Sequence, residues 1–311
     1  MQRRNVIWVT EHIHPDAMAM LKGAADVIGP GPLPETRRGD VTAIVVRAHK
    51  VDRPLLENLP GLKVIGKHGA GTDNIDMDVA RGRNLQVFRA DGANAESVAD
   101  LAVLFAMLLL RSPDLHNQSL RHDAPKRSDI PQGFEVSERK IGILGMGAIG
   151  RAVAARLVGG FGADVAGYDP ALTQETWPAG VRREADIPAL LQRTDLLFLH
   201  LPLLPETRNL IDRSQLSMLL PGAVVVNCAR GGIVNEQALA DALASGQVVA
   251  AASDVFEVEP PARDNPLLAG SGRFVATPHI GASTNAGLRR TGLIIVQKVL
   301  DALNALEGEN A

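Results

Sequence analysis

Short apolar runs recur along the chain, and stretches with the spacing of amphipathic helices separate them. Most runs are apolar throughout rather than alternating, which is typical of strands buried on both faces of a parallel sheet. The runs span residues 6–10, 43–47, 62–66 and 85–88, with a weaker candidate at Val27, and then 141–144, 164–168, 196–201, 223–227, 248–253 and 274–276. Helical patterns cover 15–21, 149–158 and 235–244, the last with Asn235 as its candidate N-cap and Gly246 near its end. This alternation predicts an α/β protein.

Two long helical patterns, over residues 94–111 and 286–306, interrupt the alternation. The polar segment 112–139 follows the first of them and contains three prolines, so we expect a connector there. A new series of strands and helices begins at residue 141. We therefore expect two doubly wound parallel-sheet domains, one formed by residues 1–112 and 286–311 and the other by the inserted residues 113–285.

The composition excludes several classes of protein. Of the 311 residues, 46% are hydrophobic and 22% are charged, which excludes a disordered or fibrous chain. The formal net charge of −3 gives no basic surface for nucleic acid or an anionic membrane, so neither is expected as a partner. The longest apolar run, 101–110, is shorter than the roughly 20 residues that a membrane span needs. A single cysteine, Cys228, allows neither an internal disulfide nor a cysteine-based metal site; we expect no metal and a cytoplasmic location.

A glycine-rich motif follows the run 141–144 and opens the next predicted helix. Its glycines permit a tight turn and a close approach of the backbone to a pyrophosphate, which then faces the helix N-terminus. Asp169 ends the next predicted strand, nineteen residues beyond the motif. Its carboxylate suits the ribose hydroxyls and repels a 2′-phosphate, so the pattern predicts NAD as the cofactor in preference to NADP. The candidate cofactor-binding residues of the motif are Gly145, Gly147, Ala148, Ile149 and Gly150.

Three further segments lie at predicted strand ends of the inserted domain, where open α/β sheets bind their ligands. They read Asn227-Cys-Ala-Arg-Gly-Gly, Asp254-Val-Phe-Glu-Val-Glu-Pro-Pro and Thr277-Pro-His-Ile-Gly-Ala-Ser-Thr. In this order after a mid-chain glycine motif, they resemble the D-isomer-specific 2-hydroxyacid dehydrogenases, most closely the subgroup of D-3-phosphoglycerate dehydrogenases and hydroxypyruvate reductases. The resemblance runs from about residue 43 to 283. It implies a Rossmann-type NAD domain inserted into a flavodoxin-like substrate domain, and a homodimer.

The resemblance also implies three catalytic residues, Arg230, Glu259 and His279. A guanidinium can grip a carboxylate and polarise the adjacent keto oxygen. A carboxylate beside an imidazole favours the protonated ring and orients it. His279 is then expected to donate a proton to the keto oxygen as hydride arrives from NADH, and to take it back in the oxidation.

Further cofactor contacts follow from the same resemblance. Residues 200–207 match a family segment that runs along the adenine and diphosphate, and Asp254 is expected to accept a hydrogen bond from the nicotinamide carboxamide. The implied cofactor contacts outside the glycine motif and Asp169 are Leu201, Pro202, Thr207, Cys228, Ala229, Arg230, Asp254, His279 and Ala282.

The segment 66–76 resembles the glycine-rich substrate loop of the family, whose backbone N–H groups suit a carboxylate. The candidate substrate-binding residues are Arg47, Lys67, His68, Gly69, Ala70 and Arg230. Surface ion pairs for Arg47 and Lys67, and a turn-filling role for His68, are equally open interpretations. Phosphoglycerate enzymes often carry Arg-Ala where this chain has Lys67-His68, which weakens an assignment to that substrate.

The favoured function is the NAD-dependent interconversion of a small anionic 2-keto acid and its D-2-hydroxy acid. 3-Phosphoglycerate, glycerate or hydroxypyruvate, and related acids all stay open as substrates. One alternative from another class is a dinucleotide-sensing protein like the C-terminal-binding-protein corepressors, which share the fold. Another alternative is a phosphite dehydrogenase, which keeps the same three catalytic residue types. Glu259 argues against formate dehydrogenases, which carry a glutamine in that role.

Overall fold

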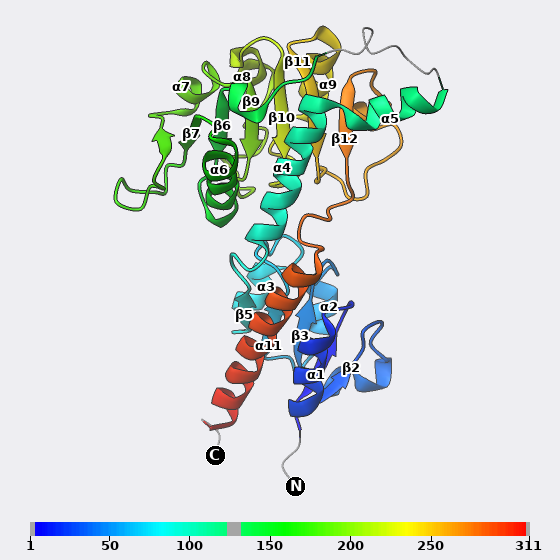
Figure 1. The fold of residues 1–311 in the computed structure, drawn as a ribbon. Helices are drawn as coiled ribbons and strands as arrows, with labels where there is room; N and C mark the ends of the chain where they lie inside the picture. Colours follow the sequence, from blue (N-terminus) through cyan, green and yellow to red (C-terminus); the bar gives the residue numbers. More distant parts are fainter. Residues whose placement is uncertain (1–3, 123–131, 309–311) are drawn as a thin grey trace. The chain divides into compact units, whose positions relative to one another are not determined.

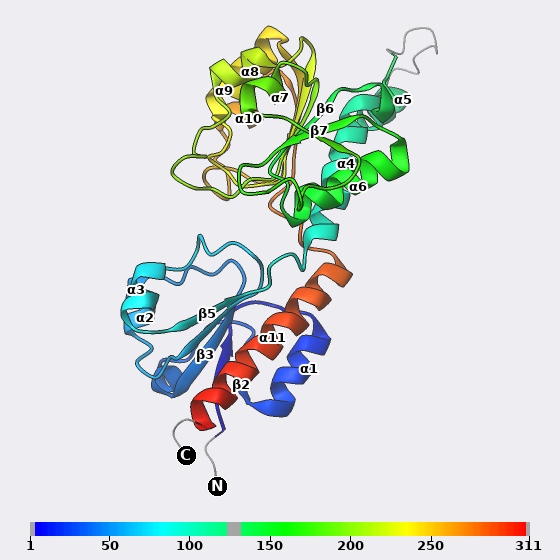
Figure 2. The same ribbon diagram turned by 90° about the vertical axis from the view of Figure 1, so that its left-hand side faces the viewer.

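The computed structural model describes residues 4–122 and 132–308, and the chain forms two compact units (Figure 1). Unit 1 comprises Met1–Ser97 and Ala282–Ala311, and unit 2 comprises Val98–Gly281. Each unit contains a parallel sheet with helices on both faces (Figure 2), which confirms the predicted pair of doubly wound α/β folds. The domain boundaries expected after residues 112 and 285 stay a prediction.

The sheet of unit 1 has the strand order β2-β1-β3-β4-β5, and all its described pairings are parallel. The chain leaves β1 to form β2 on one side and β3 on the other, so the topological switch point lies between β1 and β3. This is the flavodoxin-like order, in which ligands bind at that point. The strands are β1 (Val6–Val9), β2 (Asp26–Ile28), β3 (Val41–Val46), β4 (Val64–Lys67) and β5 (Gln86–Arg89).

Helices cover both faces of this sheet. Leu21 of α1 and Val299 of α11 are buried on one face, and Leu56 of α2 and Val79 of α3 are buried on the other. Gly66 of β4 lies so close to α11 that a Cβ there would come within 2.5 Å of the Val299 side chain. The elements are α1 (Pro15–Ala24), the 3₁₀ helix η1 (Glu35–Asp40), α2 (Arg53–Glu57), α3 (Met77–Gly82) and α11 (Asn285–Gly308).

The sheet of unit 2 has the order β12-β11-β10-β9-β6-β7-β8, again with parallel pairing throughout its described strands. Counted from β6, this is the dinucleotide-binding order 3-2-1-4-5-6 with one added strand. Its switch point lies between β6 and β9. The strands are β6 (Ile141–Leu144), β7 (Val165–Tyr168), β8 (Val181–Arg183), β9 (Leu196–Leu199), β10 (Ala223–Asn227), β11 (Val248–Ser253) and β12 (Arg273–Ala276).

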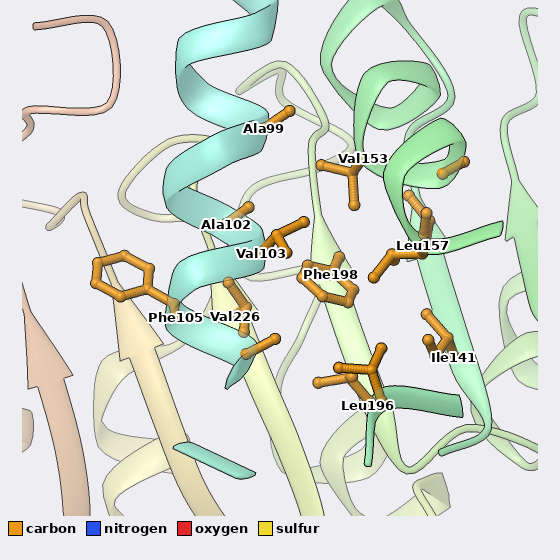
Figure 3. Packing of buried hydrophobic residues seen from close by; sticks show 14 of the residues in the cluster. Ala99, Ala102, Val103, Phe105, Ile141, Val153, Leu157, Leu196, Phe198 and Val226 are labelled. Carbon is orange, nitrogen blue, oxygen red and sulfur yellow. The ribbon is translucent and has the colours of Figure 1, made fainter. Parts of the chain in front are cut away.

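Two helices pack side by side on one face of this sheet, where Val103 of α4 and Val153 and Leu157 of α6 surround Phe198 of β9 (Figure 3). Because successive strand residues alternate in direction, Leu197 faces the opposite layer of smaller helices. The helices of unit 2 are α4 (Ala95–Arg111, from Val98 onward), α5 (Pro113–His122), η3 (Val136–Glu138), α6 (Ala148–Phe161), α7 (Ile187–Leu191), α8 (Arg213–Met218), α9 (Glu236–Ser245) and α10 (Pro266–Ala269).

Several local predictions are confirmed, and one is wrong. Asn235 caps α9 by accepting the backbone N–H of Ala238, and Gly246 ends that helix in a left-handed conformation. The predicted connector over 112–139 instead contains α5, because a proline in the first turn of a helix costs no hydrogen bond. The connector prolines at 125 and 131 lie outside the described residues.

Within residues 4–122 and 132–308, none of the helices combines the length and the apolar composition of a membrane span.

Candidate active site

The glycine motif forms the turn from β6 into α6, and its three glycines have different surroundings. Gly145 has a φ of +91°, and a Cβ there would lie 2.6 Å from the carbonyl oxygen of His200. A Cβ on Gly150 would lie 2.0 Å from the carbonyl oxygen of Gly145, so the helix packs directly on the turn. Gly147 is the N-cap of α6, and nothing stands within 4 Å of where its Cβ would be. The open space at this helix N-terminus fits a dinucleotide phosphate.

Asp169 follows β7 and ties that strand end to the glycine turn. Its two carboxylate oxygens accept the backbone N–H groups of Met146, at 2.8 Å, and Ala171, at 2.9 Å. A pocket of about 450 Å³ opens beside it, large enough for part of a nucleoside. Its lining residues are Tyr168, Asp169, Pro170, Gln174, Arg183, Glu184 and Ala185.

Arg183 and Glu184, at the end of β8, form the far wall of this pocket and were not predicted from the sequence. Arg183 donates to the carbonyl of Leu172 at 2.6 Å and lies over the ring of Trp177, with 5.1 Å to its centroid. Strand β8 has only a weak hydrophobic pattern in the sequence, because Val181 is the sole buried residue among its three.

The loop after β9 carries the predicted contacts Leu201, Pro202 and Thr207. The Thr207 hydroxyl donates to the carbonyl of Pro202 and accepts the N–H of Leu204, both at 2.7 Å. Thr207 therefore fixes the shape of this loop at the carboxyl edge of the sheet.

His279 stands after β12 in an unusual backbone conformation, with a φ of +55°. Such values are uncommon for residues with a Cβ and occur often at functional sites. The buried carboxylate of Asp254, at the end of β11, accepts the backbone N–H groups of Ile280 at 2.7 Å and Gly281 at 2.8 Å, and the Thr277 hydroxyl at 2.6 Å. The N–H of His279 itself donates to the Asp254 carbonyl at 2.8 Å. Asp254 thus holds the segment that bears His279.

Glu259 meets the imidazole of His279, with 2.8 Å between Oε2 and Nδ1. Its other oxygen accepts the N–H of Phe256 at 3.1 Å. Burial raises the pKa of Glu259, but the hydrogen bond and charge of His279, the Phe256 N–H and the charge of Arg230 together hold that pKa below its ordinary value. Because an ionised carboxylate only accepts, Nδ1 carries a proton and Nε2 is left to exchange one with a substrate.

Arg230 lies in the loop after β10, where its positive charge helps to lower the pKa of Glu259. Its guanidinium donates to the carbonyl of Ala229 at 2.7 Å. The next residue, Gly231, packs against the loop after β11 so closely that a Cβ would overlap the carbonyl of Phe256. This contact keeps the loops of Arg230 and Glu259 together, so the structure brings the three predicted catalytic residues into one cluster.

The neighbouring Cys228 and Ala229 are both buried. Burial, with a smaller effect of the Asp254 charge, raises the pKa of the Cys228 thiol above its usual range, so this cysteine is a packing residue rather than a nucleophile.

The predicted substrate residues other than Arg230 lie in unit 1, where Arg47 follows β3 and Lys67 ends β4. The Lys67 ammonium donates to the carbonyl of Arg47 and, at 2.6 Å, to Oδ1 of Asn74. Gly69 has a φ of +148°, and its carbonyl accepts the N–H of Ala90 at 2.9 Å. Lys67 therefore holds the loops of unit 1 together, whatever it contributes to a substrate.

His68 is buried beneath α11 rather than displayed on the loop, since its relative exposure is 7%. Its Nε2 lies 3.5 Å from where a Cβ of Gly292 would stand, and that atom has no hydrogen-bond partner among the described residues. Burial first, and then the charge of Arg47, lower the pKa of His68 to about 4, so the ring is neutral at physiological pH. The last predicted cofactor residue, Ala282, begins the second segment of unit 1, and its contact stays a prediction.

Residues 103–281 match the family model of the D-isomer-specific 2-hydroxyacid dehydrogenase NAD-binding domain. The chain belongs to this family. The predicted family is thereby confirmed, and unit 2 contains its NAD-binding domain.

Similar proteins carry related names. The D-3-phosphoglycerate dehydrogenase of Methanocaldococcus jannaschii is 37% identical over 310 residues, and the match covers 98% of this chain and 58% of that relative. The hydroxypyruvate reductase of Thermotoga maritima is 37% identical over 266 residues, covering 85% of each protein. The crystal structure of the TT0316 protein from Thermus thermophilus superposes with a TM-score of 0.86 at 28% identity, over 96% of this chain and 97% of the other.

Proposed function

We propose that this family member is an NAD-dependent D-2-hydroxyacid dehydrogenase, which interconverts a small 2-keto acid and the corresponding D-2-hydroxy acid. One observation carries the proposal. The ring of His279 is held 2.8 Å from a carboxylate at the carboxyl edge of an NAD-binding sheet, beside Arg230. This is the arrangement of a proton donor poised where hydride transfer takes place in such folds.

The residues of unit 2 supply the proton chemistry and the electrostatics. Bound nicotinamide supplies the hydride donor or acceptor. In the reduction, the protonated imidazole of His279 gives its Nε2 proton to the keto oxygen, while the carboxylate of Glu259 stabilises the imidazolium beforehand. Arg230 binds the substrate carboxylate and stabilises the negative charge that develops on the keto oxygen. The oxidation uses the same groups, with neutral His279 as the base.

The cofactor contacts belong to this proposal as well. Gly147 and the N-terminus of α6 would bind the pyrophosphate, and Asp169 the adenosine ribose. Cys228 and Ala229 would line the nicotinamide position. In unit 1, the guanidinium of Arg47 and the backbone of Gly69 and Ala70 would bind the substrate anion.

The substrate is a small anionic acid, and the names of the relatives point to 3-phosphoglycerate and to glycerate or hydroxypyruvate. His68 is buried and neutral, so it does not contribute a charge that would bind a distal phosphate. The cytoplasmic location expected from the single cysteine is part of the same proposal.

The proposed enzyme is a homodimer. Apolar side chains stand in solvent on α4 and α5 of unit 2, with Leu104 at 55% and Leu120 at 66% exposure, and a second copy would cover them. Sedimentation at micromolar concentration is expected to give the mass of two chains, and the mass of one chain would contradict the dimer.

A panel of keto acids with NADH tests the proposed activity. Glyoxylate, pyruvate, hydroxypyruvate, 3-phosphohydroxypyruvate and a sulfonated keto acid are each mixed with the protein, and NADH oxidation is followed by its absorbance. We expect turnover of at least one keto acid, with a product of D configuration for every substrate other than glyoxylate, whose product is achiral. NADH binding without turnover would favour a dinucleotide sensor, and reduction of NAD by phosphite alone would favour a phosphite dehydrogenase; either result would overturn the proposal.

A further inference from the structure

A carboxylate of unit 1 occupies a cradle of backbone N–H groups at the end of β3. Oε1 of Glu11 accepts the N–H groups of Ala48 and His49, each at 2.6 Å, and Oε2 accepts the N–H of Arg47 at 2.9 Å. Three successive N–H groups that converge on one anion form a nest, an arrangement that proteins use to bind phosphates and carboxylates. Here the chain fills the nest with its own side chain.

The Glu11 carboxylate is held in its ionised form. Burial opposes its ionisation, but hydrogen bonds from the Thr10 hydroxyl and from the three N–H groups outweigh that effect and lower the pKa of Glu11 below its ordinary value. The interaction therefore persists throughout the neutral pH range.

The opposite side of the same segment, residues 47–49, is held by its carbonyl oxygens. The carbonyl of Arg47 accepts from Lys67, and the carbonyl of His49 accepts from the amide of Asn74 at 2.6 Å. The segment is thus clamped between the Glu11 anion on its N–H groups and, on its carbonyl groups, the Lys67 cation at Arg47 and the Asn74 amide at His49. Elements β1, β3 and β4 are joined through this clamp at one end of the sheet.

The clamped segment starts with Arg47, which follows β3 beside the switch point between β1 and β3. Ligands of flavodoxin-like sheets bind at that point. One guanidinium nitrogen of Arg47 donates to the carbonyl of His12 at 3.1 Å, so the β1 loop holds this arginine by its side chain and, through Glu11, by its backbone.

We propose that Glu11 is a positioning residue for substrate binding, which acts through Arg47. Glu11 occupies the nest and thereby fixes the backbone that carries the Arg47 guanidinium. Because Glu11 already fills the nest, the substrate anion binds the guanidinium and not the N–H groups of the nest. The inference rests on the proposed function, because it takes Arg47 to be a substrate-binding residue.

A double-mutant cycle in the full-length protein tests this role. Glu11→Gln, Arg47→Ala and the double variant are compared with the parent protein for the keto acid that the panel selects, at saturating NADH. Glu11→Gln removes the charge and replaces one accepting oxygen by an NH2 group that faces a backbone donor of the nest, so we expect KM for the keto acid to rise about tenfold or more with kcat and KM for NADH retained. In the Arg47→Ala background the same change is expected to add nothing, because both act on one contact.

A chemical rescue separates positioning from a merely structural role and provides a second variant. Glu11→Ala leaves the nest empty, and added acetate is expected to fill it and lower KM again, whereas acetate is expected to give no such gain in Glu11→Ala/Arg47→Ala. Glu11→Asp keeps the charge on a shorter side chain and is expected to give an intermediate KM. Asp16→Asn is the matched control, since it removes an acid of the same unit whose arginine partner, Arg289, is itself exposed.

The outcomes are distinguishable. Suppose that the parent protein reduces keto acids. If the fold-changes in KM caused by Glu11→Gln and Arg47→Ala then multiply in the double variant, or if Arg47→Ala leaves every KM unchanged, the positioning role is wrong and the proposed function stands. If the parent protein reduces no keto acid, the proposed function is wrong, and so is this inference, which rests on it. Thermal unfolding and NADH binding of each variant establish that it is folded.

Discussion

His279 depends on two carboxylates, one for the position of its backbone and one for the state of its ring. Asp254 binds the N–H groups of Ile280 and Gly281 and so holds the turn in which His279 adopts its positive φ. Glu259 binds Nδ1 and leaves Nε2 for the substrate. At the scale of the residue, the proposed acid–base chemistry therefore depends on two carboxylates. The buried carboxylate of Asp254 holds the backbone of His279, and the partly exposed carboxylate of Glu259 acts on its ring through its charge.

Replacing Glu259 by Gln tests the electrostatic half of this arrangement. His279 lowers the pKa of Glu259, so by reciprocity the ionised carboxylate favours the imidazolium, which is the proton donor in the reduction. Glutamine keeps an oxygen for Nδ1 but removes the negative charge that stabilises the imidazolium over the neutral ring. We expect the alkaline limb of the pH profile of kcat/KM for reduction to move toward acid, and the oxidation to stay active at lower pH.

Glu257→Gln is the matched control, because Glu257 lies on the same loop but pairs with Arg208 at 3.1 Å. Its pH profile should be that of the parent protein. An unchanged profile in Glu259→Gln, with a deuteride isotope effect showing that hydride transfer limits the rate, would contradict the coupling of Glu259 to His279.

At the scale of the element, buried strands were the most predictable features. The strand predicted over 223–227 has the same bounds as β10. All five residues are buried, and an apolar run this short is typical of a strand within a parallel sheet. Strand β8 could not be predicted, since Arg182 and Arg183 are exposed. Helix α5 was hidden by its polar sequence, although Asp114 anchors it to Arg273 of β12 at 2.8 Å.

Asp169 joins two elements, and this decides how its role in cofactor preference must be tested. Its carboxylate accepts the N–H of Met146 in the glycine turn, so Asp169→Ala would disturb the turn as well as the ribose site. Asp169→Asn keeps an acceptor oxygen and removes the charge that repels a 2′-phosphate. We expect the ratio of kcat/KM for NADP to that for NAD to rise about tenfold or more, as measured with both cofactors under the same conditions. An unchanged ratio would show that other groups set the preference.

At the scale of the whole molecule, local patterns in the sequence predicted the two parallel-sheet folds and the glycine motif, whereas the catalytic residues Arg230, Glu259 and His279 were inferred from the resemblance to the family. The contacts between distant segments could not be read in this way. Glu11 lies 36 residues from Arg47, and no periodicity links the two. Lys67 and His68 are adjacent in sequence, yet one clamps a neighbouring loop and the other is buried under α11. Side-chain direction at a strand end depends on what packs there.

The most direct test of the proposed chemistry is the kcat of His279→Ala in keto-acid reduction, measured together with its affinity for NADH. If His279 is the proton donor, kcat falls by about 10²–10⁴-fold, the usual contribution of general acid catalysis, while the dissociation constant for NADH is unchanged. If His279→Ala keeps the kcat of the parent protein, the cluster of Arg230, Glu259 and His279 is not the catalytic centre.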